Sequence, residues 1–137
     1  MLIHTQDMLP LLVEACPSFA PRWEEGSADS FLDKEGNLLM YIALGSLAHH
    51  LVNLGSAGKC DEFPAVFAVV ERLQVEGDHD VREAATIGLL EGVQNHAGWA
   101  RLDTGIFLRH LGPESRKWWE KLEQFWQGNP HALREEP

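Results

Sequence analysis

A polar edge interrupts an otherwise apolar stretch near the middle of the chain. Glu91 and Asn95 lie one helical turn apart, which places both side chains on the same helix face. If this edge is buried, its carboxylate and amide need partners, which Tyr41, His49 or Arg82 could supply. These residue types suit a small ligand or acid–base chemistry, so Tyr41, His49, Glu91 and Asn95 form a candidate polar pocket. A solvent-facing strip is the alternative interpretation of the same pattern.

The seven histidines raise the question of a metal site. His49 and His50 are adjacent, so on a helix they point about 100° apart and do not easily share one ion. His79 lies between Asp78 and Asp80, which would give one corner of a site made from carboxylate and imidazole. The sequence brings no third ligand to that corner. We therefore predict no metal and no cofactor.

Familiar catalytic motifs do not occur in the sequence. The segment 55–60 resembles a phosphate-binding loop only superficially, because it lacks the spacing and the hydroxyl residue after the lysine. There is no zinc-protease helix motif, nucleophile elbow or Cys-x-x-Cys pair, so we predict no catalytic residue. Cys16 and Cys60 make no disulfide framework, and the first residues lack the positive region of a signal peptide. These features favour a reducing, cytoplasmic location.

The chain is acidic, and this restricts the class of partner. The formal net charge is −10 and the sequence pI is near 5.0. Nucleic acids and anionic membranes favour basic surfaces, so both are excluded as expected partners. A basic protein partner would be attracted instead. The acidic residues expected to dock it follow the first helices: Glu24, Glu25, Asp29, Asp33 and Glu35.

Apolar residues recur at helical spacing along the chain, and no alternating pattern lasts long enough to predict a strand. The sequence predicts an all-α fold of five or six helices in antiparallel hairpins, either α-solenoid-like or an irregular bundle. We expect a single domain over 1–128 and a flexible C-terminal tail over 129–137. The main expected helices span 38–54, 61–76, 78–97, 104–111 and 113–127.

The helix over 78–97 is apolar on most of its circumference, which is typical of an interior helix. Asp78 or Asp80 can cap its first turn. Gly88 and Gly92 are spaced by four, and each weakens a helix by about 1 kcal/mol relative to Ala. We expect that another helix backbone approaches closely at these two positions.

The last expected helix carries a narrow apolar arc that contains several tryptophans. Docking of this arc onto the core is the simplest interpretation. Exposed rings would instead favour a partner site or a structural homodimer through Trp118, Trp119 and Trp126.

Two resemblances add to these expectations. Residues 78–85, with an aspartate, a valine and an arginine before paired alanines, resemble the second helix of a HEAT-type repeat. On residues 41–48 and 70–95, the chain also resembles a family of small acidic bacterial proteins of unknown function. That resemblance implies an all-helical fold and a role as a protein-binding or toxin-immunity protein, and it brings no catalytic residues.

We therefore expect a protein-binding module, in its sharper form an immunity-type protein that covers a basic toxin. This interpretation favours binding over catalysis. The alternatives are a small-ligand-binding protein or enzyme with a pocket near His49, Glu91 and Asn95, and a structural homodimer.

Overall fold

The fold is all-α. A computed structural model describes residues 2–28, 31–128 and 133. Within these residues there is no strand of a sheet, only the isolated bridges Ile3–Gly77 and Leu32–Leu38, and no helix is long and apolar enough to cross a bilayer. The elements in chain order are α1 (Thr5–Ala15), the 3₁₀-helix η1 (Pro17–Phe19), α2 (Ala20–Ala28), α3 (Met40–Ser56), α4 (Phe63–Glu76), α5 (His79–Glu83), the π-helical segment η2 (Ala84–Leu90), α6 (Glu91–Ala100), α7 (Gly105–Leu108) and α8 (Pro113–Trp126).

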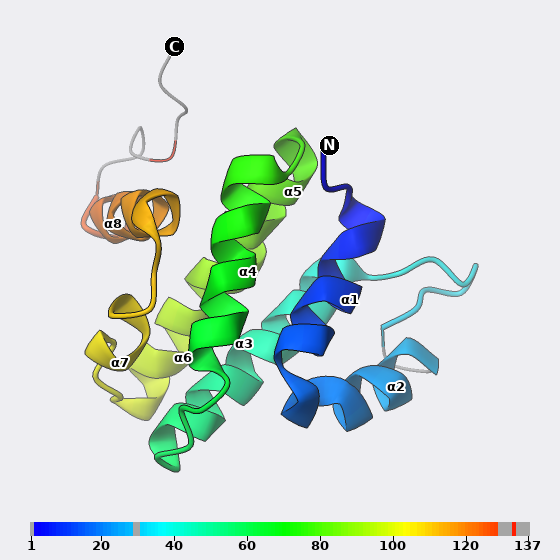
Figure 1. The fold of residues 1–137 in the computed structure, drawn as a ribbon, viewed down its shortest axis with the longest axis horizontal. Coiled ribbons are helices and arrows are strands. Elements are labelled where there is room, and N and C mark those ends of the chain that lie inside the picture. Colours follow the sequence, from blue (N-terminus) through cyan, green and yellow to red (C-terminus); the bar gives the residue numbers. More distant parts are fainter. Residues whose placement is uncertain (1, 29–30, 129–132, 134–137) are drawn as a thin grey trace.

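One continuous helix, formed by α5, η2 and α6, runs through the middle of the molecule (Figure 1). Asp78 caps it as expected, because its Oδ1 accepts the backbone N–H of Val81 at 2.9 Å. Asp80 is not the cap and lies in the first turn. The π-helical geometry of η2 was not expected. Such geometry is rare in proteins and concentrates at functional sites.

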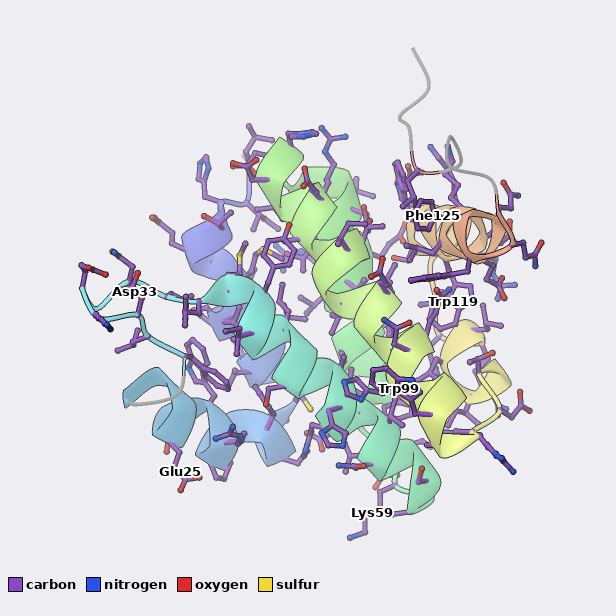
Figure 2. All side chains as sticks on the ribbon, turned by 180° about the vertical axis from the view of Figure 1, so that it is seen from behind. Glu25, Asp33, Lys59, Trp99, Trp119 and Phe125 are labelled. Atoms are coloured by element: carbon purple, nitrogen blue, oxygen red, sulfur yellow. The ribbon has the colours of Figure 1, made fainter. Side chains whose placement is uncertain are left out.

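Helix α3 packs along this central helix in the same direction. A Cβ atom built on Gly88 would lie 2.8 Å from Leu44 Cδ1, and one on Gly92 would lie 2.9 Å from Ala48 Cβ. The residue numbers at these contacts increase in the same direction along both helices, so the two helices run parallel. They lie side by side in Figure 2. Helix α3 thus approaches closely at both expected glycines: a side-chain carbon would meet the Ala48 Cβ at Gly92, and at Gly88 it would meet the side chains of Leu44 and Tyr41.

Helix α4 comes between α3 and α5 in the chain and lies in front of α3 and the central helix in Figure 1, where it forms the centre of a second layer. It packs against α1 on one side and α8 on the other (Figure 1). Phe63 and Phe67 of α4 meet Phe107 of α7, with ring centroids of Phe63 and Phe107 5.1 Å apart. Burial of three aromatic rings at one point gives this layer a large apolar contribution to stability.

Several helix starts differ from the sequence expectation. Helix α3 begins at Met40 rather than Leu38, because Leu38 pairs with Leu32 and the N–H of Leu39 donates to Phe31 O at 2.6 Å. Helix α4 begins at Phe63 rather than at Asp61. Helix α2 spans Ala20–Ala28 and so contains Glu24 and Glu25, which were expected to follow the first helices.

The start of α8 is capped by a side chain from α4. The Glu71 carboxylate accepts the N–H groups of Glu114 at 3.1 Å and Ser115 at 2.9 Å, and also the Ser115 hydroxyl at 2.8 Å. A Cβ atom on Gly112 would overlap the Glu71 carboxyl group, so glycine leaves room for this cap. The negative charge also suits the positive end of the helix dipole.

Candidate functional site

The predicted acidic residues do not form one cluster. Glu24 and Glu25 are exposed on α2, Asp33 and Glu35 lie on the loop before α3, and Asp29 lies outside the described residues. Asp33 and Glu25 are well separated in Figure 2.

Asp33 organises this loop while keeping its charge. Its Oδ1 accepts the N–H groups of Glu35 at 2.9 Å and Asn37 at 2.8 Å. The N–H of Asn37 lowers the pKa of the Asp33 carboxyl more than any other contact. Among the described residues, no ion pair involves Asp33 or Glu35. Within the described residues, no salt bridge therefore neutralises the carboxylates of Asp33 and Glu35.

Tyr41 lies in a cleft where α1, α3 and α5 meet. The cleft has a volume of about 510 Å³, and its lining residues are Thr5, Gln6, Leu38, Met40, Tyr41, Asp80 and Glu83. Tyr41 is 45% exposed, so its ring is available to a ligand. The other three residues of the predicted polar pocket are not among the lining residues of this cleft.

The chain before α1 holds this cleft together. The N–H of Ile3 donates to Glu76 O at 2.8 Å, and the N–H of Asp78 donates to Ile3 O at 3.1 Å. Beside these bonds, the His4 ring Nδ1 lies 3.1 Å from Asp78 Oδ2. These contacts fix the start of α1 against the start of α5. This backbone pairing fixes the relative position of two of the three helices that line the cleft.

Negatively charged side chains surround the aromatic ring of Tyr41 in this cleft. Burial raises the pKa of the Tyr41 phenol, and the carboxylates of Glu83 and Asp80 raise it further. Asp80 and Glu83 are both exposed, and Glu83 Oε2 lies 3.3 Å from His79 Nε2. A neutral aromatic ring beside two carboxylates is a suitable environment for a cationic group.

The remaining polar residues of the predicted pocket lie elsewhere on the two parallel helices. His49 of α3 stacks on His96 of α6, with ring centroids 4.7 Å apart and planes at 12°. Trp99 meets His96 edge-on at 5.1 Å and is 76% exposed. Glu91 and Asn95 are half-buried, and burial raises the pKa of Glu91. Within the described part of the chain, no three His, Cys, Asp or Glu side chains converge as a metal site would require.

Sequence reasoning missed a second polar group, because its members come from three separate elements. Ser18 Oγ of η1 lies 2.8 Å from His50 Nε2 of α3. Glu62, just before α4, accepts the Ser18 N–H at 2.9 Å. Burial lowers the pKa of His50, so its imidazole is neutral at pH 7. Glu62 therefore helps to hold η1 against α3 and α4, and its carboxylate also acts on His50, whose pKa it raises against the larger effect of burial.

The tryptophans of α8 divide between the core and the surface. Trp119 is 1% exposed and lies between the central helix and α8, where its carbonyl accepts Gln94 Nε2 at 3.1 Å (Figure 2). Trp118 is half-buried, and Trp126 is 57% exposed. A homodimer through this helix, which stays a prediction, would therefore rest on Trp126 more than on Trp119.

Comparison with known proteins assigns the chain to a family. The model of the family described as a domain of unknown function (DUF7674) matches residues 9–127, so the chain belongs to that family. The match extends from α1 to the end of α8 and includes most of the Tyr41 cleft. No curated protein and no solved structure matches the chain.

Proposed function

We propose that this member of the DUF7674 family binds a basic partner protein and seats one cationic side chain of that partner in the Tyr41 cleft. The observation that carries the proposal is the exposed ring of Tyr41 beside the carboxylates of Asp80 and Glu83. Both carboxylates line the same cleft as the ring and raise the pKa of its phenol, so they would attract a cation placed over the ring.

An arginine side chain fits the chemistry of this cleft best. Its guanidinium can stack on the Tyr41 ring while its edge donates to the carboxylates of Asp80 and Glu83. The apolar side chains of Leu38 and Met40 line the same cleft and suit the alkyl part of the arginine. A cation over an aromatic ring contributes about 0.5–2 kcal/mol, depending on how far it is desolvated.

The acidic loop before α3 leads directly to Leu38, which lines the cleft. Asp33 and Glu35 lie on the loop that leads through Leu38 to Tyr41, and the whole chain carries a net charge of −10. Such a field increases the rate at which a basic partner arrives. An immunity-type role, in which this surface covers a basic toxin in the cytoplasm, is the sharper form of the proposal. It is supported by the net negative charge of the chain and by the resemblance of residues 41–48 and 70–95 to a family of small acidic bacterial proteins.

The proposal is tested with a labelled tetra-arginine amide, whose binding is followed by fluorescence anisotropy. The double variant Asp80→Asn/Glu83→Gln should weaken binding about tenfold, which corresponds to about 1.4 kcal/mol. The matched control is Glu24→Gln/Glu25→Gln, which changes the net charge equally on α2. It should weaken binding by no more than about twofold, through the long-range field alone.

Tyr41 itself separates ring stacking from charge. Tyr41→Phe keeps the aromatic face and should bind as the wild type does, whereas Tyr41→Leu should bind several-fold more weakly. Equal losses in the two double variants would show that binding follows net charge only. That result, or full binding by Tyr41→Leu, would contradict the assignment of the cleft.

A further inference from the structure

The polar group around Ser18 brings a hydroxyl, an imidazole, a thiol and a carboxylate together. Ser18 Oγ lies 2.8 Å from His50 Nε2 and 3.7 Å from Cys16 Sγ. Glu62 Oε1 accepts the Ser18 N–H at 2.9 Å. None of these four residues lines the Tyr41 cleft, so the group is separate from the surface assigned to a basic partner.

The contact between Ser18 and His50 has the geometry of a nucleophile and its base. A serine hydroxyl becomes a nucleophile when a neutral base accepts its proton at hydrogen-bond distance, and 2.8 Å meets that distance. His50 packs on the buried ring of Phe19, with ring centroids 5.5 Å apart, and burial lowers its pKa, so the imidazole is neutral at pH 7. With its own proton on Nδ1, the imidazole accepts the Ser18 O–H at Nε2. Ser18 is exposed, so an electrophile in solution can reach it.

Two neighbours favour transfer of the proton from Ser18 to His50. Burial raises the pKa of Cys16 to about 11, so its thiol stays protonated and can donate to Ser18 Oγ, which leaves the Ser18 proton for His50. The charge of Glu62 raises the pKa of His50 against the larger effect of burial, so it stabilises the imidazolium that forms. His49 acts in the opposite direction and lowers the pKa of His50.

We propose that Ser18 is an acyl-acceptor site, at which an activated ester transfers its acyl group to Ser18 Oγ with His50 as the general base. Ser18 Oγ attacks the carbonyl carbon while its proton passes to His50 Nε2. The bond between the carbonyl carbon and the leaving oxygen then breaks, and the leaving group departs as an alcohol with the proton from Nε2. The products are an ester on Ser18 and a free alcohol, and the imidazole returns to its neutral form. The function proposed above does not use this site, so the two are tested separately.

The test treats the full-length protein with p-nitrophenyl acetate and follows the release of p-nitrophenolate by absorbance. Peptide mapping by mass spectrometry then locates the acetyl group. The wild type should release about one equivalent in a burst and carry the acetyl group on Ser18. Ser18→Ala keeps the backbone N–H that Glu62 accepts, so it should fold as the wild type does and lose the burst. His50→Gln should slow the labelling of Ser18 at least about tenfold.

The pH profile of Ser18 labelling identifies the base even if His50→Gln disturbs folding. Because burial lowers the pKa of His50, the wild-type rate should rise with the neutral fraction of this imidazole and level off above about pH 6.5. Glu62→Gln should shift the midpoint of the profile to lower pH, since Glu62 raises the pKa of His50. His49→Gln, the matched variant, should shift it to higher pH, since His49 lowers that pKa.

Ser56 is the internal control for the chemistry of an exposed serine. It lies on the same helix as His50, but at a spacing that turns its side chain to another face, so it should stay unlabelled under conditions that label Ser18. Labelling of Ser18 no faster than that of Ser56, or equally fast in His50→Gln and in the wild type, would overturn the proposal. A labelling rate that rises continuously with pH, as for an unassisted hydroxyl, would overturn it as well.

Discussion

The parallel contact between α3 and the central helix can be tested at Gly92 and Gly45. Both glycines lie within helices, but they differ in the room around them for a side chain. A Cβ atom on Gly92 would lie 2.9 Å from Ala48 Cβ, whereas one on Gly45 of α3 would have no neighbour within 4 Å. In both places, alanine gains about 1 kcal/mol of helix propensity over glycine. Gly45→Ala should therefore stabilise the protein by about 1 kcal/mol.

Gly92→Ala should behave differently because its methyl group meets another methyl group. Carbon atoms pack favourably at about 3.5–4.0 Å, so a separation of 2.9 Å forces α3 and α6 apart. Overpacking of this kind costs about 1–3 kcal/mol, which cancels or exceeds the gain in propensity. The free energies of unfolding of the two alanine variants should differ by about 1–3 kcal/mol.

The assay is urea unfolding followed by circular dichroism, with the cycle completed by Ala48→Gly and Ala48→Gly/Gly92→Ala. Removing the opposing methyl group should recover the overpacking cost, which gives a favourable coupling free energy of about 1–3 kcal/mol. If Gly92→Ala stabilises the protein as much as Gly45→Ala does, and the cycle shows no coupling, the close helix contact is wrong.

Three further predictions concern local sites. Burial lowers the pKa of His50, so as the pH drops this imidazole is protonated in the unfolded chain before it is protonated in the folded protein. The free energy of unfolding should therefore fall below about pH 6.5. His50→Gln should remove this part of the pH dependence of the urea unfolding midpoint. Burial raises the pKa of Cys16 to about 11, so a thiol reagent at mildly alkaline pH should modify half-buried Cys60 first and Cys16 only on unfolding. Glu71→Ala removes the cap of α8 and should cost about 2 kcal/mol in chemical denaturation, whereas unchanged stability would show that the Glu71–Ser115 bonds contribute little.

The sequence predicted the helical class and one critical contact, because both depend on local patterns. Gly88 and Gly92 indicated a close helix approach, and Asp78 was correctly one of two proposed caps. The start of α3 was wrong because Leu38 pairs with Leu32 in the preceding loop. Pairing of this kind competes with helix initiation and leaves no periodic signal.

The candidate site was predicted only in part. Tyr41 was predicted as a pocket residue from the sequence, but Asp80 and Glu83 were not predicted beside it, because their place there depends on the packing of α1, α3 and α5. The contact between Ser18 and His50 likewise joins positions far apart in the chain. The π-helical geometry of η2 also escaped prediction, since a shift from i→i+4 to i→i+5 bonding has no clear sequence signature.

The central claim is that Tyr41 sits in a negative cleft that accepts a cation, and its own titration tests this most directly. Tyr41 is the single tyrosine of the chain, so absorbance at the phenolate band reports it alone. The phenol pKa should lie above its ordinary value of about 10 in the free protein and should fall in Asp80→Asn/Glu83→Gln. Saturating tetra-arginine amide, which stays charged at that pH, should also lower it. A pKa at or below about 10, or one that the peptide does not move, would contradict the account.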